Sequence, residues 1–103
     1  MDLPQDILMP EVLEVAQLSL QANKETAWDL PMGVRRMKVQ ARSNVDVKLS
    51  DRQGEVVAGQ AYWTIKAGQA FEVDGVATRG QTLYLAAATP VTVEIAIWRA
   101  TGG

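Results

Sequence analysis

Large aliphatic and polar residues alternate in short runs along most of this chain. In the last run, 91–99, aliphatic side chains take every second position: Val91, Val93, Ile95 and Ile97. A period of two places alternate side chains on opposite faces of a β-strand. Such runs recur roughly every 8 to 12 residues and are separated by turn-forming residues, which is typical of a sandwich or barrel. The pattern predicts an all-β protein with a single antiparallel β-sandwich of jelly-roll-like form.

The strand boundaries follow from this period and from the turn residues between the runs. Strands are predicted over 12–21, 26–30, 34–42, 45–50, 61–65, 70–73, 82–87 and 91–99, with a short edge piece at 55–58. Ser43-Asn44 is a tight turn suited to a hairpin, because Asn tolerates a positive φ. Arg79-Gly80-Gln81 is predicted as a break before the strand at 82–87. No helix long enough to organise the fold is expected.

The first predicted strand has an irregular pattern. Leu13 and Val15 are two residues apart, and so are Leu18 and Leu20, but the apolar phase shifts between the two pairs. A bulge or bend near Gln17 would account for this shift. A short amphipathic helix over 10–18 is the competing interpretation.

Residues 1–11 are predicted to form an extended N-terminal arm, and residues 12–103 the sandwich domain. Pro4 and Pro10 bias the residues before them away from the helical conformation. The arm is apolar, and its large hydrophobic side chains are Leu3, Ile7, Leu8 and Met9. Such side chains are costly to leave in water, so they are candidates for an interface with a neighbouring chain. A disordered tail is the alternative.

The composition narrows the possible functions. The 103 residues suit one domain, and a formal charge of −2 is too small to direct the chain to nucleic acid or an anionic membrane. The chain has no Cys and no His, so the commonest catalytic base and transition-metal ligand are missing. Carboxylates are scattered rather than paired across a cleft. We therefore expect no enzyme activity, no cofactor and no metal, with no nucleic-acid or membrane partner.

No targeting or membrane-spanning segment is expected. The first residues lack the basic region and long apolar run of a Sec signal. The longest run without a charged residue, 80–93, contains Pro90 and is too short to span a membrane.

Two tryptophans are candidates for a binding surface. Trp63 and Trp98 each neighbour an inward-facing aliphatic position, so they could lie under a neighbouring chain or form a platform for a sugar. Alternatively, they could cap the core together with Trp28. We favour capping of the core or burial under a neighbouring chain over carbohydrate binding.

Three motifs in the second half of the chain resemble small β-sandwich structural proteins of tailed bacteriophages. The motifs are Trp63-Thr64-Ile65-Lys66-Ala67-Gly68-Gln69, Gly80-Gln81-Thr82-Leu83-Tyr84-Leu85 and Val93-Glu94-Ile95-Ala96-Ile97-Trp98. They are similar to strands and turns of capsid decoration, or cement, proteins. They carry no catalytic residues with them.

The resemblance implies a virion structural protein. It would be made in the host cytoplasm, bind the major capsid protein on the outer capsid surface, and stabilise contacts between capsid subunits. It would form a homo-oligomer, with a trimer favoured. The alternative is a module of a tail, baseplate or fibre that binds a host surface glycan through Trp63 or Trp98.

Overall fold

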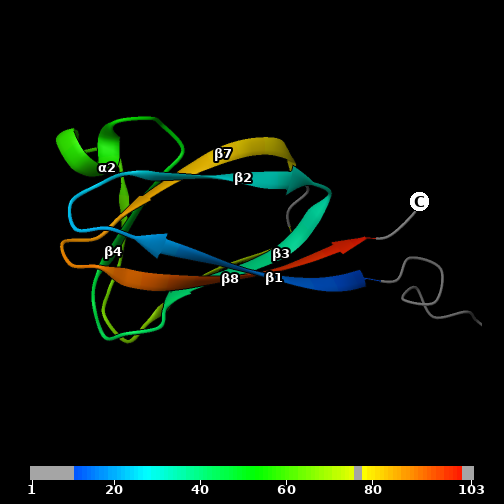
Figure 1. Ribbon diagram of the computed structural model, residues 1–103. Coiled ribbons are helices and arrows are strands. Elements are labelled where there is room, and N and C mark those ends of the chain that lie inside the picture. Colours follow the sequence, from blue (N-terminus) through cyan, green and yellow to red (C-terminus); the bar gives the residue numbers. More distant parts are fainter. Residues whose placement is uncertain (1–10, 76–77, 101–103) are drawn as a thin grey trace, which may run out of the picture.

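A computed structural model describes residues 11–75 and 78–100. They form two antiparallel sheets of four strands each, packed face to face (Figure 1). The first sheet has the order β1 (Glu11–Leu20), β8 (Val91–Ala100), β3 (Val34–Ala41), β6 (Ala70–Asp74). The second has the order β2 (Thr26–Met32), β7 (Arg79–Ala86), β4 (Val47–Ser50), β5 (Trp63–Ile65). The chain changes sheet at almost every connection, which is the jelly-roll arrangement, so the predicted fold class is confirmed.

The core is made by alternate side chains of facing strands. In β8, every residue of the predicted aliphatic face is buried, and Ile95 is only 1% exposed. In β3, Met37 and Val39 point inward while Arg36 and Gln40 are exposed, as the alternation expected of a strand requires. Trp28 packs against the edge of this core and is partly buried. The period of two therefore assigned the inward faces of these strands correctly.

β1 is a strand, as predicted, but it has no bulge. Its register with β8 is unbroken from Glu11 opposite Ala100 to Leu20 opposite Val91. The predicted bend near Gln17 and the competing helix are both wrong. Because the register does not shift, Leu18 and Leu20 face the core while Leu13 and Val15 face outward.

The turn at Ser43-Asn44 does not close a hairpin. β3 lies in the first sheet and β4 in the second, so the connection crosses from one layer to the other. The backbone N–H of Arg42, just after β3, donates instead to the carbonyl of Thr92 on β8 (2.8 Å). Turn residues predict that the chain reverses direction. They do not predict which strands pair afterwards, because that depends on contacts with distant parts of the chain.

The predicted edge piece at 55–58 is a one-turn helix, α2 (Glu55–Ala58). Gly54 has a φ of 89°, a left-handed conformation that starts this turn, and Val56 is buried beneath it. The Glu55 carboxylate accepts hydrogen bonds from the backbone N–H groups of Gln60 (3.0 Å) and Ala61 (2.9 Å). These contacts close the loop, which explains why β5 begins at Trp63 rather than at Ala61.

The predicted break at 79–81 is part of β7. Arg79 lies opposite Met32 and Gln81 opposite Leu30, so the pairing with β2 continues through Gly80. Gly80 has a φ of 83°, which explains why a glycine occurs within this strand.

Candidate functional site

The outer face of the first sheet carries exposed apolar side chains where β1 begins and β8 ends. Leu13 lies opposite Trp98, and Val15 lies opposite Ala96. Leu13 is 53% exposed and Val15 63% exposed. We call these four residues the apolar strip. Apolar side chains grouped in this way on a sheet face mark a surface that another chain can cover.

Trp98 is not an open platform within this strip. The Arg36 guanidinium carbon lies 4.3 Å from the centroid of the Trp98 ring, in cation–π geometry. Arg36 is also the cross-strand neighbour of Trp98 on β3, and Leu13 is its neighbour on β1. With a guanidinium over one ring face, Trp98 is better placed to pack in a protein interface than to stack on a sugar.

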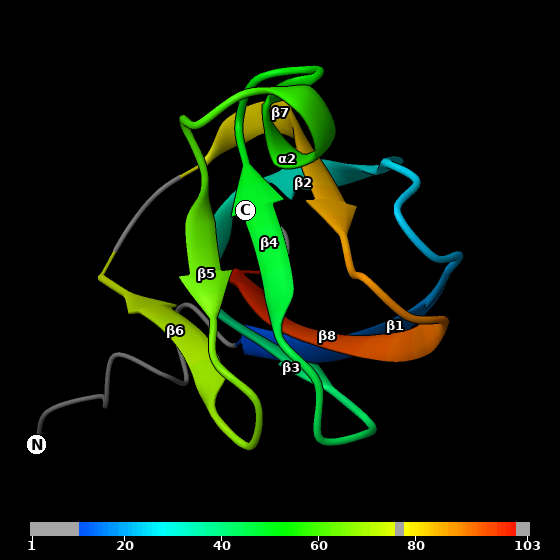
Figure 2. The same ribbon diagram turned by 90° about the vertical axis from the view of Figure 1, so that its left-hand side faces the viewer.

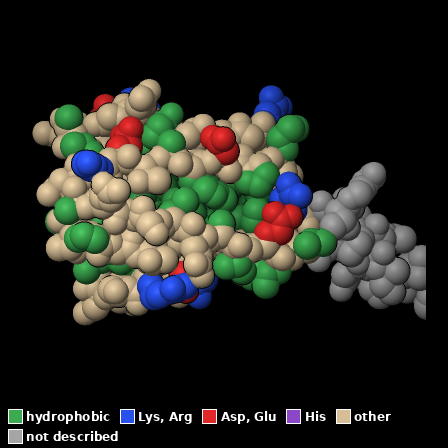
Figure 3. Space-filling model, viewed as in Figure 1, with side chains coloured by type: hydrophobic (Ala, Val, Ile, Leu, Met, Phe, Trp, Pro, Cys, Tyr) green, Lys and Arg blue, Asp and Glu red, His purple; other side chains and the backbone are tan. Residues whose placement is uncertain are grey.

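The sandwich is open between the edges of β1 and β2, and we call this hollow the β1–β2 gap. Its volume is about 220 Å³. The side chains that line it are mainly apolar: Ala16, Trp28, Pro31, Ile95 and Ile97. Figure 3 shows hydrophobic side chains along the hollow between the two sheets on this side of the molecule.

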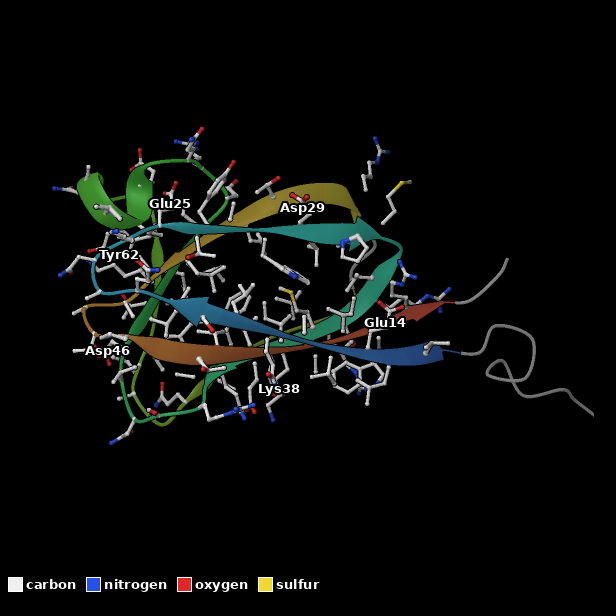
Figure 4. The ribbon with its side chains drawn as sticks, in the orientation of Figure 1. Glu14, Glu25, Asp29, Lys38, Asp46 and Tyr62 are labelled. Atoms are coloured by element: carbon white, nitrogen blue, oxygen red, sulfur yellow. The ribbon has the colours of Figure 1, made fainter. Side chains whose placement is uncertain are left out.

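The rim of the β1–β2 gap is acidic. Glu14 on β1 and Asp29 on β2 lie on opposite sides of it (Figure 4). Glu14 forms an ion pair with Arg99 (3.1 Å), and Asp29 accepts a hydrogen bond from the Thr82 hydroxyl (2.9 Å). Both carboxylates thus have partners and leave the apolar floor of the gap accessible.

Further from the strip, the outer face of the first sheet is polar. The Arg42 guanidinium forms an ion pair with the Glu94 carboxylate (3.0 Å), and the Lys38 ammonium lies 3.9 Å from the Glu72 carboxylate. Hydrogen bonds from the Gln40 side chain and then from Arg42 lower the pKa of Glu94. Lys38 and Arg42 on this face thus have acidic partners in the same sheet.

A second opening, the β5–β6 cleft, lies on the opposite side of the sandwich. β5 and β6 are neighbouring edges of different sheets (Figure 2), and the cleft between them has a volume of about 850 Å³. Trp63 is 63% exposed there, and its ring centroid is 6.3 Å from that of Phe71 on β6. Tyr62, with the Lys48 ammonium 4.7 Å from its ring centroid, also lines the cleft.

The β5–β6 cleft also has polar lining residues. They are Ser50, Asp51, Gln60, Thr78, Arg79 and Gln81. Within residues 11–75 and 78–100, no group of acidic side chains is placed to hold a metal ion, and no helix is long and apolar enough to cross a membrane. An apolar cleft with a few polar groups can bind a small molecule.

The structure places the predicted interface residues in different locations. Trp63 lies in the β5–β6 cleft and Trp98 in the apolar strip, so the two do not form one surface. Leu3, Ile7, Leu8 and Met9 fall outside the described residues. Leu13 and Val15 were missed as surface residues because the phase shift between Val15 and Leu18 was interpreted as a bulge.

Comparisons with known proteins support the fold alone. No family model matches the chain, and no curated protein matches it. One similar solved structure is the NMR structure of a de novo designed double-stranded β-helix. It has a TM-score of 0.51 and 14% sequence identity, over 84% of this chain and 97% of the designed one. The chain therefore has a double-stranded β-helix fold, and such a likeness carries no function.

Proposed function

We propose that this chain is a non-enzymatic structural protein of a tailed-bacteriophage virion. In this role it is a capsid decoration protein, made in the host cytoplasm, that binds the major capsid protein on the outer capsid surface. It stabilises contacts between capsid subunits and acts as a homo-oligomer, for which a trimer is favoured. The similarity of its strand and turn motifs to this group of proteins suggests the role.

The observation that carries the proposal is the apolar strip. Leu13 and Val15 are more than half exposed although both belong to a regular strand that is paired with β8. Covering each of them would contribute up to about 1.5–3 kcal/mol, so the fold favours contact with another chain. A decoration protein needs such a surface, because it gains stability by binding to an assembly.

The site chemistry agrees with an attachment role. The carboxylates with lowered pKa values, Glu55 and Glu94, make hydrogen bonds that hold the chain's own loop and sheet. A general acid would instead have a raised pKa and lie at a cleft. The jelly roll itself occurs in capsid proteins, lectins and cupins, so it is compatible with the role without selecting it.

The test is binding to phage heads. The purified chain is added to expanded heads that lack it, and bound copies are counted by quantitative mass spectrometry. We expect a high, saturable copy number that follows the symmetry of the head. We expect lower occupancy for the double variant Leu13→Gln/Val15→Thr and unchanged occupancy for Val57→Thr, which alters an exposed apolar residue on α2. A few copies, located only on the tail, would refute the decoration role.

The β5–β6 cleft favours a second candidate function. Trp63 and Tyr62 offer aromatic surface next to Asp51 and Gln60, an arrangement that can stack on and hydrogen-bond to a sugar. In this alternative, the chain is a tail, baseplate or fibre module that binds a host surface glycan. A glycan array probed with the chain and with Trp63→Ala tests it. Binding that Trp63→Ala removes would support the module, and an array without hits would exclude the tested glycans.

A further inference from the structure

We infer that residues 1–10 of one copy add as an extra strand along the free edge of β1 in a neighbouring copy. This inference rests on the proposed function, because it names the contact by which copies of the decoration protein join. The receiving surface consists of the β1 edge, the apolar strip on one side of it and the β1–β2 gap on the other.

The edge of β1 is unusually open to pairing. Natural sheets protect their edges with short strands, prolines, bulges or charges. β1 is a regular ten-residue strand without proline, glycine or bulge. It carries Glu11 and Glu14, and the Glu14 carboxylate is paired with Arg99 (3.1 Å). By contrast, the edge strand β2 contains Pro31, β5 has only three residues, and β6 has only five, two of them acidic. Of the four described edges, β1 is the least protected.

Apolar surface lies on both sides of this edge. The outward-facing Leu13 and Val15 belong to the strip, whereas Ala16, Trp28 and Ile97 line the gap between the sheets. A strand added beside β1 would direct alternate side chains to the strip and to the gap. Both of its faces would therefore be covered, and its sequence should be apolar at consecutive positions.

Residues 1–10 contain such a segment. Ile7, Leu8 and Met9 are three consecutive large apolar residues. They belong to the five-residue run 5–9, in which every residue has a backbone N–H, between Pro4 and Pro10. A second copy of β1 matches less well, because Glu14 and Gln17 interrupt its apolar residues. The segment 1–10 is thus the better occupant.

The sequence disfavours pairing within one chain. To lie along its own β1, the segment would have to reverse direction at Met9-Pro10-Glu11. Two-residue hairpin loops need residues that accept a positive φ, usually Gly, Asn or Asp, and none lies between Ile7 and Val12. Pro10 also keeps Met9 extended. Ten extended residues reach at most about 33–36 Å, which is enough to meet an adjacent copy.

Disulfide trapping tests the contact, since the chain has no cysteine of its own. Leu8→Cys and Ile7→Cys are each mixed with Val15→Cys, with affinity tags of different size on the two partners, and oxidised. We expect a cross-linked pair of unlike chains, stronger for one of the neighbouring positions 7 and 8 than for the other, because strand side chains alternate. Val57→Cys, 51% exposed on α2, is the matched control and should not cross-link.

Light scattering on the full-length chain gives a second measurement. We expect the unmodified chain to be oligomeric, Ile7→Asp/Leu8→Asp to be monomeric, and Val57→Asp to remain oligomeric. The inference would be overturned if the unmodified chain were monomeric and the mixed cysteine variants formed no cross-link. A disulfide formed only within one Leu8→Cys/Val15→Cys chain would show that the segment folds back on its own strand. Pairing of Val15→Cys with itself after residues 1–10 are removed would show direct contact between two β1 strands.

These outcomes are separate from the test on phage heads. If the chain binds heads in high copy number but the cysteine variants form no cross-link, the proposed function stands and this inference fails. If the cross-link forms but the chain does not bind heads, the contact between copies stands and the decoration role fails.

Discussion

The two open sides of this sandwich have the same architecture and different chemistry. On each side, one edge strand of each sheet borders a hollow that reaches the core. The β1–β2 gap is about 220 Å³ and borders a ten-residue strand, whereas the β5–β6 cleft is about 850 Å³ and borders a three-residue strand. The first presents apolar side chains and a long unpaired backbone. The second presents exposed aromatic rings and polar groups.

The difference shows that the architecture does not assign a role to either side. A long edge with free N–H and C=O groups suits a partner strand, because backbone pairing requires several consecutive residues. A wide cleft beside a short edge offers little backbone and suits a compact ligand. The lengths and side chains of the edge strands, rather than the jelly roll, therefore decide which side is better suited to a partner strand.

The largest expected effect comes from the core beneath the β1–β2 gap. Ile95 lines this gap and is 1% exposed, so Ile95→Ala removes fully packed carbons. We expect a loss of about 2–5 kcal/mol in the free energy of unfolding, measured by urea denaturation. Val73→Ala on β6 is only half-buried and lines the β5–β6 cleft, so it should cost about 1 kcal/mol. Equal losses would contradict the tighter packing on the β1 side.

The sequence predicted the core better than the proposed binding surface. Ile95 and its neighbours in β8 face inward as their period requires, because one consistent pattern covers the whole strand. In β1 the pattern conflicts with itself at Gln17, and the long register with β8 decides the faces. The pattern of residues within β1 alone cannot predict how this strand pairs with β8, which is far away in the sequence. The same limit explains the wrong hairpin at Ser43-Asn44.

The candidate sites were only partly predictable. Trp63 and Trp98 were identified by residue type, but their separation into a cleft and a strip depends on the sheet to which each strand belongs. The β5–β6 cleft joins residues from six strands and could not be read from any one segment. One sequence signal could have identified the apolar strip. The apolar phase shifts between Val15 and Leu18, and this shift means that the apolar residues before it face outward while those after it face the core.

The second prediction concerns the apolar strip. Leu13→Gln/Val15→Thr removes apolar contact without adding charge. We expect at least about a tenfold weaker self-association, or about 1.4 kcal/mol, measured by sedimentation equilibrium. The stability of the isolated subunit should change by no more than about 0.5 kcal/mol, because both side chains are exposed. Self-association unchanged by this variant would remove the strip from the interface.

The third prediction concerns the aromatic pair at the β5–β6 cleft. Trp63→Ala removes the tilted ring contact with Phe71, which is worth about 0.5–1.5 kcal/mol. We expect a loss of stability in this range and no change in self-association, measured by urea denaturation and sedimentation. A change in oligomeric state would show that the β5–β6 side also receives a protein chain, and the contrast between the two sides would fail.

The smallest expected effect is a pH dependence of the loop before β5. Hydrogen bonds from the backbone N–H groups of Ala61 and then Gln60 lower the pKa of the Glu55 carboxyl in the folded chain. A folded-state pKa below the unfolded value gives stability that is present above the ordinary Glu pKa of about 4.3 and is lost as the pH falls through the lowered value. Acidification should therefore loosen the 55–61 loop before β5.

Hydrogen exchange at Gln60 and Ala61 should accelerate at acid pH relative to amides of β7, a strand without carboxylates. Glu55→Gln, which cannot ionise, should lack this added pH dependence. Equal pH dependence in the variant and the unmodified chain would show that the Glu55 charge does not hold this loop.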